Sequence, residues 1–201
     1  MRVISGTAKG RPLKAVPGTG TRPTTDKVKE AIFSMIGPYF SGGWVLDLFA
    51  GTGGLGIEAL SRGMDRAIFI DMEKKSVEVV NDNLRATNLQ ERAEVFRNEA
   101  GRAVKALAKR KARFELVFLD PPYRLKIAED LMRSLQELAL LDDRATIVVE
   151  HDAEHRYEEE VGDCVCIRRA EYGETVISIY RYEPKADNDL SSTQGQELDQ
   201  P

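Results

Sequence analysis

The chain has 201 residues, 42% of them hydrophobic, and a net charge of −4, which suits one domain with a short appendage. No run approaches the roughly 18 apolar residues of a membrane-spanning helix. The basic N-terminus is not followed by the apolar segment of a secretory signal, so we expect a cytoplasmic protein.

Charge is distributed unevenly along this chain. Residues 1–30 carry seven Lys or Arg against two acids, a balance of +5, whereas residues 183–201 have a balance of −4. A basic segment on an acidic body fits local contact with phosphates better than long-range attraction of a polyanion. We therefore expect residues 1–23 to form a basic nucleic-acid-binding arm; the alternative is a solvated arm without a partner.

The apolar pattern predicts one helix and then alternating strands and helices. Residues 1–23 read as short strands or loop, and Thr24-Thr25-Asp26 are N-cap residue types. A helical apolar stripe runs from Val28 to Tyr39 and is ended by Gly37-Pro38. Strands are then expected at 44–49, 66–71, 93–96, 114–119 and 145–150, with helices at 54–62, 73–87, 99–109 and 126–140.

The last apolar runs, 163–171 and 174–182, are typical of an antiparallel hairpin. Cys164 and Cys166, the only cysteines, lie on the first run and are expected to be strand neighbours rather than a metal or redox site. Residues 24–183 thus predict an α/β, Rossmann-like domain with a seven-stranded, mostly parallel sheet. Residues 184–201 are expected to form a disordered acidic tail.

A glycine-rich stretch follows the strand at 44–49. Gly51, Gly53 and Gly56 satisfy G-x-G-x-x-G, a pattern that can hold a dinucleotide pyrophosphate. Asp47 argues against that ligand, because its carboxylate would repel a pyrophosphate at the helix N-terminus. It suits a ligand with a cationic end and no phosphate, such as S-adenosylmethionine.

Polar side chains stand at successive strand ends: Asp47, Asp71, Asn98 with Glu99, and Asp120. In a doubly wound sheet the ligand crevice lies beyond the carboxyl ends of the strands. These positions can face, in turn, the ammonium, the ribose and the adenine of an adenosine-containing cofactor, and the reacting centre. A nicotinamide dinucleotide is the alternative ligand.

Asp120-Pro121-Pro122-Tyr123 follows the strand at 114–119. The exocyclic amine of a nucleobase is a poor nucleophile, because its lone pair is delocalised into the ring. Asp120 and the Pro121 carbonyl can accept its N–H groups, the two prolines stiffen the turn, and Tyr123 offers a stacking face worth roughly 1–3 kcal/mol. The tetrapeptide predicts methylation of the amine of an unstacked base; an ordinary turn is the alternative.

Together these motifs resemble the bacterial RsmD-type 16S ribosomal RNA guanine-N2 methyltransferases. The resemblance covers residues 2 to about 182 and includes RVISG, GRPL, RPTTDKVKE, LDLFAGTGGLGIEALSRG and LDPPY. The glycine-rich and DPPY elements are shared with many amino-methyltransferases, whereas the N-terminal elements are more specific.

The resemblance implies a Rossmann-like methyltransferase fold, S-adenosylmethionine as donor, and transfer to N2 of a guanine in 16S RNA of the small ribosomal subunit. Independently of the resemblance, we expect a monomer without a metal site. It implies catalytic roles for Asp120, Pro121, Pro122 and Tyr123; cofactor contacts for Asp47, Phe49, Gly51, Gly53, Asp71, Asn98, Glu99, Asp120, Thr24 and Thr25; and RNA contacts for Lys9, Arg11, Lys14, Arg22 and Tyr123. At position 99 many relatives are expected to have Asp, whereas this chain has Glu. The resemblance therefore leaves open whether Asn98 or Glu99 contacts the adenine.

Two other functions fit parts of the pattern. A DNA adenine-N6 methyltransferase would use the same DPPY chemistry, but such enzymes generally need a sizeable target-recognition domain, for which no segment is long enough. A non-catalytic ribosome-assembly or RNA-binding module is disfavoured by the complete set of cofactor-binding and amine-binding residues.

Overall fold

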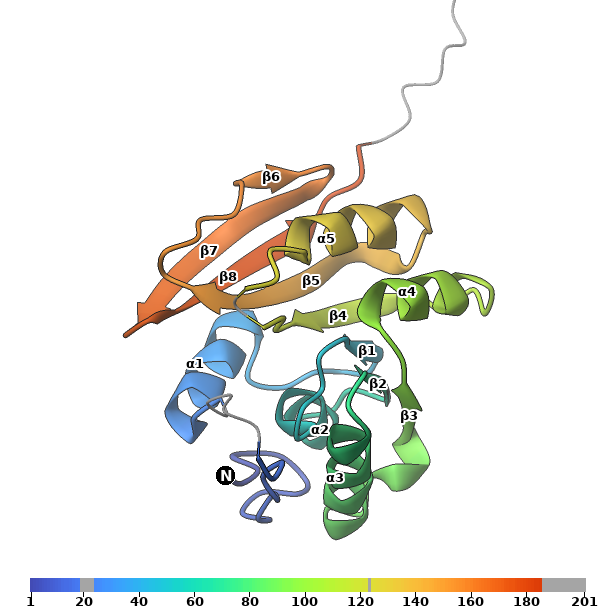
Figure 1. The fold of residues 1–201 in the computed structure, drawn as a ribbon, viewed down its shortest axis with the longest axis vertical. Helices are drawn as coiled ribbons and strands as arrows, with labels where there is room; N and C mark the ends of the chain where they lie inside the picture. Colours follow the sequence, from blue (N-terminus) through green and yellow to red (C-terminus); the bar gives the residue numbers. More distant parts are fainter. Residues whose placement is uncertain (19–23, 123, 186–201) are drawn as a thin grey trace, which may run out of the picture.

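The computed structural model describes residues 1–18, 24–122 and 124–185, and Figure 1 shows its helices and strands. In chain order they are α1 (Asp26–Ile36), β1 (Trp44–Asp47), α2 (Gly54–Ser61), β2 (Arg66–Asp71), α3 (Lys74–Ala86), the 3-10 turn η1 (Gln90–Arg92), β3 (Ala93–Arg97), α4 (Ala100–Ala108), β4 (Phe114–Leu119), α5 (Ala128–Glu137), β5 (Leu141–Asp152), β6 (Glu160–Val161), β7 (Cys164–Tyr172) and β8 (Thr175–Tyr182). None of the helices in these described ranges has the length and apolar character that crossing a bilayer requires.

One sheet contains every strand in the described ranges, in the order β3-β2-β1-β4-β5-β8-β7-β6. Strands β1 to β5 pair in parallel, and β8, β7 and β6 continue the sheet antiparallel, as predicted for a mostly parallel sheet with a closing hairpin. The predicted count of seven strands is wrong. The additional strand that the prediction missed is β6, which has two residues and is too short to show an alternating apolar pattern.

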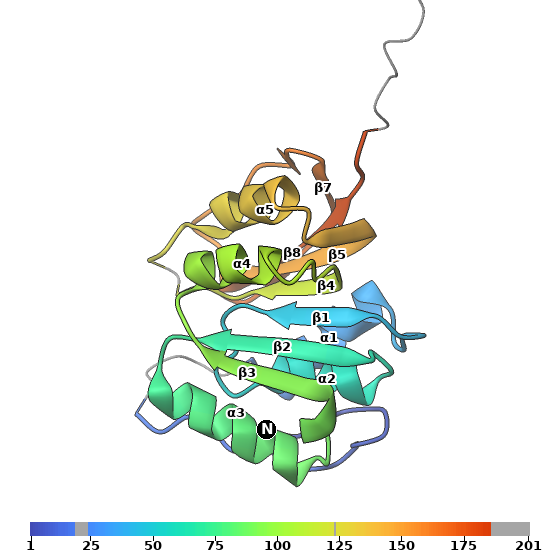
Figure 2. The same ribbon diagram turned by 90° about the vertical axis from the view of Figure 1, so that its right-hand side faces the viewer.

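Helices cover both faces of the sheet (Figure 2). On one face α4 and α5 bury Val104, Leu131 and their neighbours against the strands. On the other face α1, α2 and α3 bury Phe33, Ile57 and Val80. This arrangement follows from the right-handed crossovers that join parallel strands, and it leaves the carboxyl ends of β1 to β5 at one edge.

Helix α1 has the predicted ends, and its buried face includes the predicted Val28, Ile32, Met35 and Ile36 but is wider than the predicted stripe. Thr25 is its N-cap and accepts the Val28 N–H at 3.2 Å, and the chain leaves the helix at Gly37, whose φ is 127°. Tyr39 was predicted on its apolar stripe but lies beyond its end and is 63% exposed. Lys29, counted in the sequence among the basic groups of the arm, is instead fully buried.

Residues 1–18 pack against α1, α2 and α3. Val3, Ala8 and Leu13 are buried in the same core as the helices, and Arg2 forms an isolated bridge with Pro12. The segment therefore closes the helical side of the domain.

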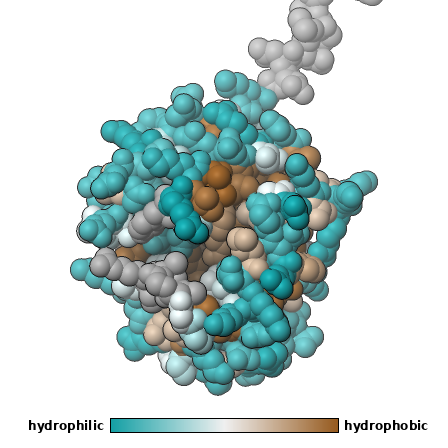
Figure 3. Space-filling view, viewed as in Figure 1, coloured by the Kyte–Doolittle hydropathy of each residue, from teal (hydrophilic) through white to brown (hydrophobic). Residues whose placement is uncertain are grey.

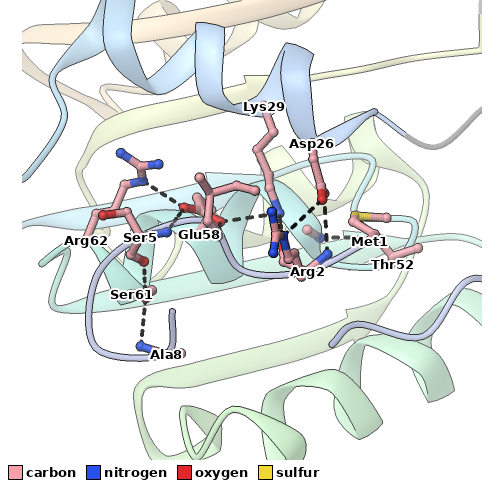
Figure 4. Close-up of polar contacts among 12 residues, drawn as sticks. Met1, Arg2, Ser5, Ala8, Asp26, Lys29, Thr52, Glu58, Ser61 and Arg62 are labelled. Carbon is pink, nitrogen blue, oxygen red and sulfur yellow. Dashed lines mark hydrogen bonds and ion pairs between the residues drawn. The ribbon is translucent and has the colours of Figure 1, made fainter. Parts of the chain in front are cut away.

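A buried carboxylate on α2, that of Glu58, anchors this segment (Figure 4). It accepts the backbone N–H groups of Ile4 and Ser5 at 2.9 and 3.0 Å, and it pairs with Lys29 Nζ at 3.3 Å and Arg62 Nε at 2.8 Å. Burial lowers the pKa of Lys29, and the charge of Glu58 opposes that shift. Glu58 thus connects the N-terminal segment, α1 and α2 through charge-assisted hydrogen bonds.

Candidate active site

The fold brings the predicted polar strand ends together. Asp47 and Asp71 are the last residues of β1 and β2, Asn98 follows β3, and Asp120 follows β4. Because these strands are adjacent and parallel, their ends share one edge of the sheet. In Figure 1 the arrowhead of β4 points to the middle of the molecule, and Figure 3 shows a hollow in that region with apolar side chains gathered beside it.

The glycine-rich turn is held open beside Asp71. Gly51 has a φ of 55°, and a Cβ placed on it would meet nothing within 4 Å, so its left-handed backbone rather than crowding requires glycine. Asp71 accepts the N–H of Gly51 at 2.8 Å through Oδ2 and that of Glu73 at 2.9 Å through Oδ1. Gly53 is the left-handed N-cap of α2. The N–H groups of Gly51 and Glu73 therefore fix the carboxylate of Asp71 beside the glycine-rich turn.

Two carboxylates at this edge of the sheet, those of Asp47 and Asp120, are largely shielded from solvent. Burial raises the pKa of Asp47 to about 7, the neighbouring Asp71 adds to the rise, and the Gly56 and Phe49 N–H groups oppose it. Burial also raises the pKa of Asp120 well above its ordinary value, and Glu150 and Asp47 repel its charge. No Lys or Arg among the described residues forms an ion pair with these groups.

Glu150 is a member of this cluster that the sequence reasoning missed. It lies on β5, is 7% exposed, and its Oε2 accepts the hydroxyl of Thr24 at 3.0 Å. Thr24 therefore contacts the crevice, whereas Thr25 is exposed and caps α1. A signal was present, because Glu150 ends the expected strand 145–150 just as Asp71 ends the expected strand 66–71.

The two candidates for an adenine contact have different surroundings. Glu99 is exposed and caps α4, accepting the N–H groups of Gly101 and Arg102 at 2.8 and 3.0 Å. The Gly101 N–H is the main cause that holds the pKa of Glu99 below its ordinary value. Asn98 is half-buried and donates its backbone N–H to the Asp71 carbonyl at 3.0 Å. Of these two residues, only Asn98 has a backbone hydrogen bond to Asp71 at the end of β2.

The DPPY turn begins in the crevice and leads out of it. Within the described ranges, Asp120 has no hydrogen-bond partner for its half-buried carboxylate. Pro121 is buried, and Pro122 is exposed and accepts the Leu125 N–H at 2.7 Å. Tyr123 lies outside the described residues. Phe49, predicted beside the cofactor, is half-buried and packs against the core under α4 and α5.

Two of the predicted RNA-contacting residues, Arg11 and Lys14, contact helix α3. Lys9 is exposed; Arg11 Nη1 lies 3.5 Å from the carbonyl of Ala86; and Lys14 Nζ pairs with Asp82 at 3.1 Å. Arg22 lies outside the described residues. The contact of Lys9, Arg11 and Lys14 with RNA stays a prediction.

The comparisons with known proteins agree with one another. The family model described as conserved hypothetical protein 95 matches residues 1–181. The putative rRNA methyltransferase YlbH of Bacillus subtilis (strain 168) is 54% identical over 181 residues, which cover 90% of this chain and 98% of YlbH. Ribosomal RNA small subunit methyltransferase D of Escherichia coli (strain K12) is 32% identical over 94% of this chain and 93% of its own length.

A solved structure extends the similarity to three dimensions. The putative methyltransferase yhhF from Escherichia coli superposes with a TM-score of 0.77 at 34% sequence identity, covering 92% of this chain and 99% of yhhF. The similarity therefore includes the N-terminal segment as well as the sheet and its helices.

Proposed function

This chain belongs to the RsmD family, whose model is described as conserved hypothetical protein 95, and we propose that it methylates the exocyclic N2 amine of a guanine in 16S ribosomal RNA with S-adenosylmethionine as donor. Methylation of ribosomal RNA is the activity named for the relatives at 54% and 32% identity. The choice of guanine N2 rests on the sequence resemblance and on the chemistry of the site.

One observation carries the proposal: Asp47, Asp120 and Glu150 are carboxylates gathered at one crevice without a compensating cation among the described residues. Such a cluster attracts a positively charged ligand and disfavours a pyrophosphate. S-adenosylmethionine has an ammonium and a sulfonium group and no phosphate. Its fit is supported further by the open space beside Gly51.

The chain's residues would hold the donor along the strand ends. Asp47 would face the ammonium, Asp71 the ribose hydroxyls, and Asn98 or Glu99 the adenine. The remaining proposed contacts are Phe49, Gly51, Gly53, Thr24, Thr25 and Asp120. When bound, the donor supplies a methyl group on a sulfonium leaving group; the protein supplies position and electrostatics.

The amine would be bound by the DPPY turn. Asp120 accepts one N–H group and the Pro121 carbonyl accepts the other, which localises the nitrogen lone pair and aims it at the donor. Pro122 stiffens the turn, and Tyr123 provides the stacking surface for a base turned out of its surroundings. In the same proposal, residues 1–23 with Lys9, Arg11, Lys14 and Arg22 contact RNA phosphates, and 24–183 form the methyltransferase domain.

The proposal is tested by transfer of a labelled methyl group from S-adenosylmethionine. The acceptors to compare are small ribosomal subunits, naked 16S RNA, large-subunit RNA and duplex DNA. Incorporation is expected only into the small subunit or its RNA. Incorporation into duplex DNA alone would transfer the assignment to a DNA methyltransferase, and donor binding without incorporation into any acceptor would favour a non-catalytic module.

A further inference from the structure

Glu150 stands beside Asp120 because of the register between β4 and β5. These strands pair in parallel with Phe118 opposite Val148. The last matched pair is Leu119 with Val149, and Asp120 and Glu150 are the next residue on each chain. Glu150 lies within β5 and shares the face of Val148, whose core includes α1, and its charge acts on Asp120.

The surroundings of this pair are apolar or acidic. Opposite Glu150 on β8 is Ile177, which is fully buried, and from the start of α1 comes the hydroxyl of Thr24, 3.0 Å from Glu150 Oε2. The titratable group that repels Asp120 from β1 is Asp47. Across the described part of the chain, no basic side chain makes a hydrogen bond or ion pair with either member of the pair.

His151 follows Glu150 on β5 but belongs to the other face of the sheet. Its ring nitrogens lie 2.9 Å from Ser178 Oγ and 2.9 Å from the carbonyl of Asp152. It therefore offers no positive charge to the acidic pair. Burial raises the pKa of Glu150, with the Thr24 hydroxyl opposing that rise, and burial together with repulsion by Glu150 raises the pKa of Asp120. Two such carboxylates in one poorly solvated place disfavour double ionisation.

We propose that Asp120 and Glu150 share one proton in the free protein, and that binding of the positively charged methyl donor expels this proton to solvent. This inference rests on the proposed function. Glu150 is then a positioning residue that acts through Asp120: in the free protein it keeps Asp120 partly neutral, and in the complex it leaves Asp120 a full hydrogen-bond acceptor for the amine. The spent cofactor lacks the sulfonium charge, so the pair takes a proton back more readily and favours exchange of product for donor.

Proton release on binding is the readout, because a merely structural role for Glu150 would not change it. Isothermal titration of the whole chain, in buffers of different ionisation enthalpy between about pH 6 and 8, counts the protons released with S-adenosylmethionine and with S-adenosylhomocysteine. By linkage, release of one proton makes affinity rise about tenfold per pH unit. The unmodified protein is expected to release more protons with the cationic ligand than with the neutral one.

Two variants and one control isolate the pair. Glu150→Gln removes the repulsion by Glu150 and leaves the effects of burial and Asp47 in place. Asp120 is then ionised in a larger fraction of the free protein, and both the proton release and the preference for the cationic ligand should fall. Thr24→Val removes the hydroxyl that stabilises ionised Glu150, so the release should move to higher pH. Glu154→Gln makes the same chemical change as Glu150→Gln at an exposed position nearby and should leave the proton count unchanged.

The outcomes separate this inference from the proposed function. If Glu150→Gln binds S-adenosylmethionine and releases as many protons as the unmodified protein, the shared proton is refuted and the proposed function stands. If the unmodified protein does not bind S-adenosylmethionine, the proposed function itself fails. Should Glu150→Gln not fold, as judged by its thermal transition, Thr24→Val decides: an unmoved pH profile refutes the shared proton.

Discussion

Asp120 is the residue on which the proposed chemistry depends most. Its carboxylate is half-buried, has no hydrogen-bond partner among the described residues, and follows the strand in the middle of the sheet. A carboxylate without a protein partner keeps its oxygens available to accept hydrogen bonds from a ligand.

Asp120→Asn should slow methyl transfer by about 10²–10³-fold, because the amide cannot accept from the amine as a carboxylate does. Donor binding should remain largely intact, since the other proposed contacts are unchanged. Single-turnover transfer measures the rate, and titration measures binding. Asp130→Asn is the matched control, because Asp130 is exposed on α5; a near-normal rate for Asp120→Asn would exclude the proposed role of the DPPY turn.

The sequence pattern could not predict contacts between individual residues that are far apart in the chain. Thr24 and Thr25 are both N-cap types, and only the fold separates them: Thr25 caps α1, whereas Thr24 reaches Glu150, 126 positions away. Likewise, Lys29 was counted as an arm residue because its partner, Glu58, comes from another helix.

At the scale of elements, α2 and β2 approach closely at Gly56. A Cβ on Gly56 would lie 2.3 Å from Cε1 of the buried Phe69. Gly56→Ala should therefore destabilise the protein by about 1–3 kcal/mol through overpacking. Gly101→Ala in α4 is the control: its Cβ would lie 3.4 Å from the flexible carboxylate end of Glu99, and alanine favours the helix.

Denaturant unfolding of both glycine variants provides the measurement. A loss of stability for Gly56→Ala with little change or a gain for Gly101→Ala would support the close packing of α2 on β2. Equal behaviour of the two variants would show that Phe69 moves aside and that Gly56 is not required for this packing.

The N-terminal segment depends on Glu58 for its place on α2. Glu58→Gln leaves Lys29 and Arg62 buried without their ion-pair partner, which should cost about 3–5 kcal/mol. Amide exchange at Ile4 and Ser5 should accelerate more than exchange in the sheet, because both N–H groups lose a charged acceptor.

Glu78→Gln is the matched control for Glu58. Glu78 pairs with Lys74 at 3.7 Å on the exposed side of α3, and such a pair contributes at most about 0.5 kcal/mol. If both glutamate variants unfold at the same denaturant concentration, the buried cluster does not anchor the N-terminal segment.

The order of elements was predictable, and their exact extent was not. Repeated switches between strand and helix periods gave the helices, the parallel strands and the closing hairpin. The sequence missed β6 because two residues carry no period, and it began the fifth parallel strand at 145 although β5 starts at Leu141. The segment 141–144 contains Asp142, Asp143 and Arg144, and this polar run hides the pairing of Leu141 with Phe114.

For the whole molecule, the acidic cluster and the basic N-terminal residues are separate groups. The acidic cluster lies at the carboxyl ends of the strands, whereas Arg11 and Lys14 of the N-terminal segment contact Ala86 and Asp82 on α3. In the proposed complex, a large RNA would span both, with its phosphates on the basic segment and one base in the crevice. Overall net charge, which is negative, is therefore a poor guide to the partner of this protein.

Replacing Lys9 and Arg11 with Gln should weaken RNA binding most at low salt. The slope of log affinity against log salt should fall by roughly 0.7 for each single-strand phosphate that the variant no longer neutralises. Lys109→Gln with Lys111→Gln gives the same change in charge at exposed positions after α4. Filter binding across a salt series measures the RNA affinity of the unmodified protein and of both double variants. Equal slopes for the two double variants would mean that the N-terminal segment does not select the RNA.

Digestion of the methylated RNA to nucleosides tests the proposed activity most directly. Small-subunit RNA from cells lacking this protein is incubated with the purified chain and labelled S-adenosylmethionine, and the products are separated and weighed by mass spectrometry. The label is expected in N2-methylguanosine, and it should accumulate about 10²–10³-fold more slowly when Asp120→Asn replaces the unmodified protein. Label in N6-methyladenosine, or in a nucleoside methylated on a ring carbon or on the ribose, would contradict methylation of the guanine amine.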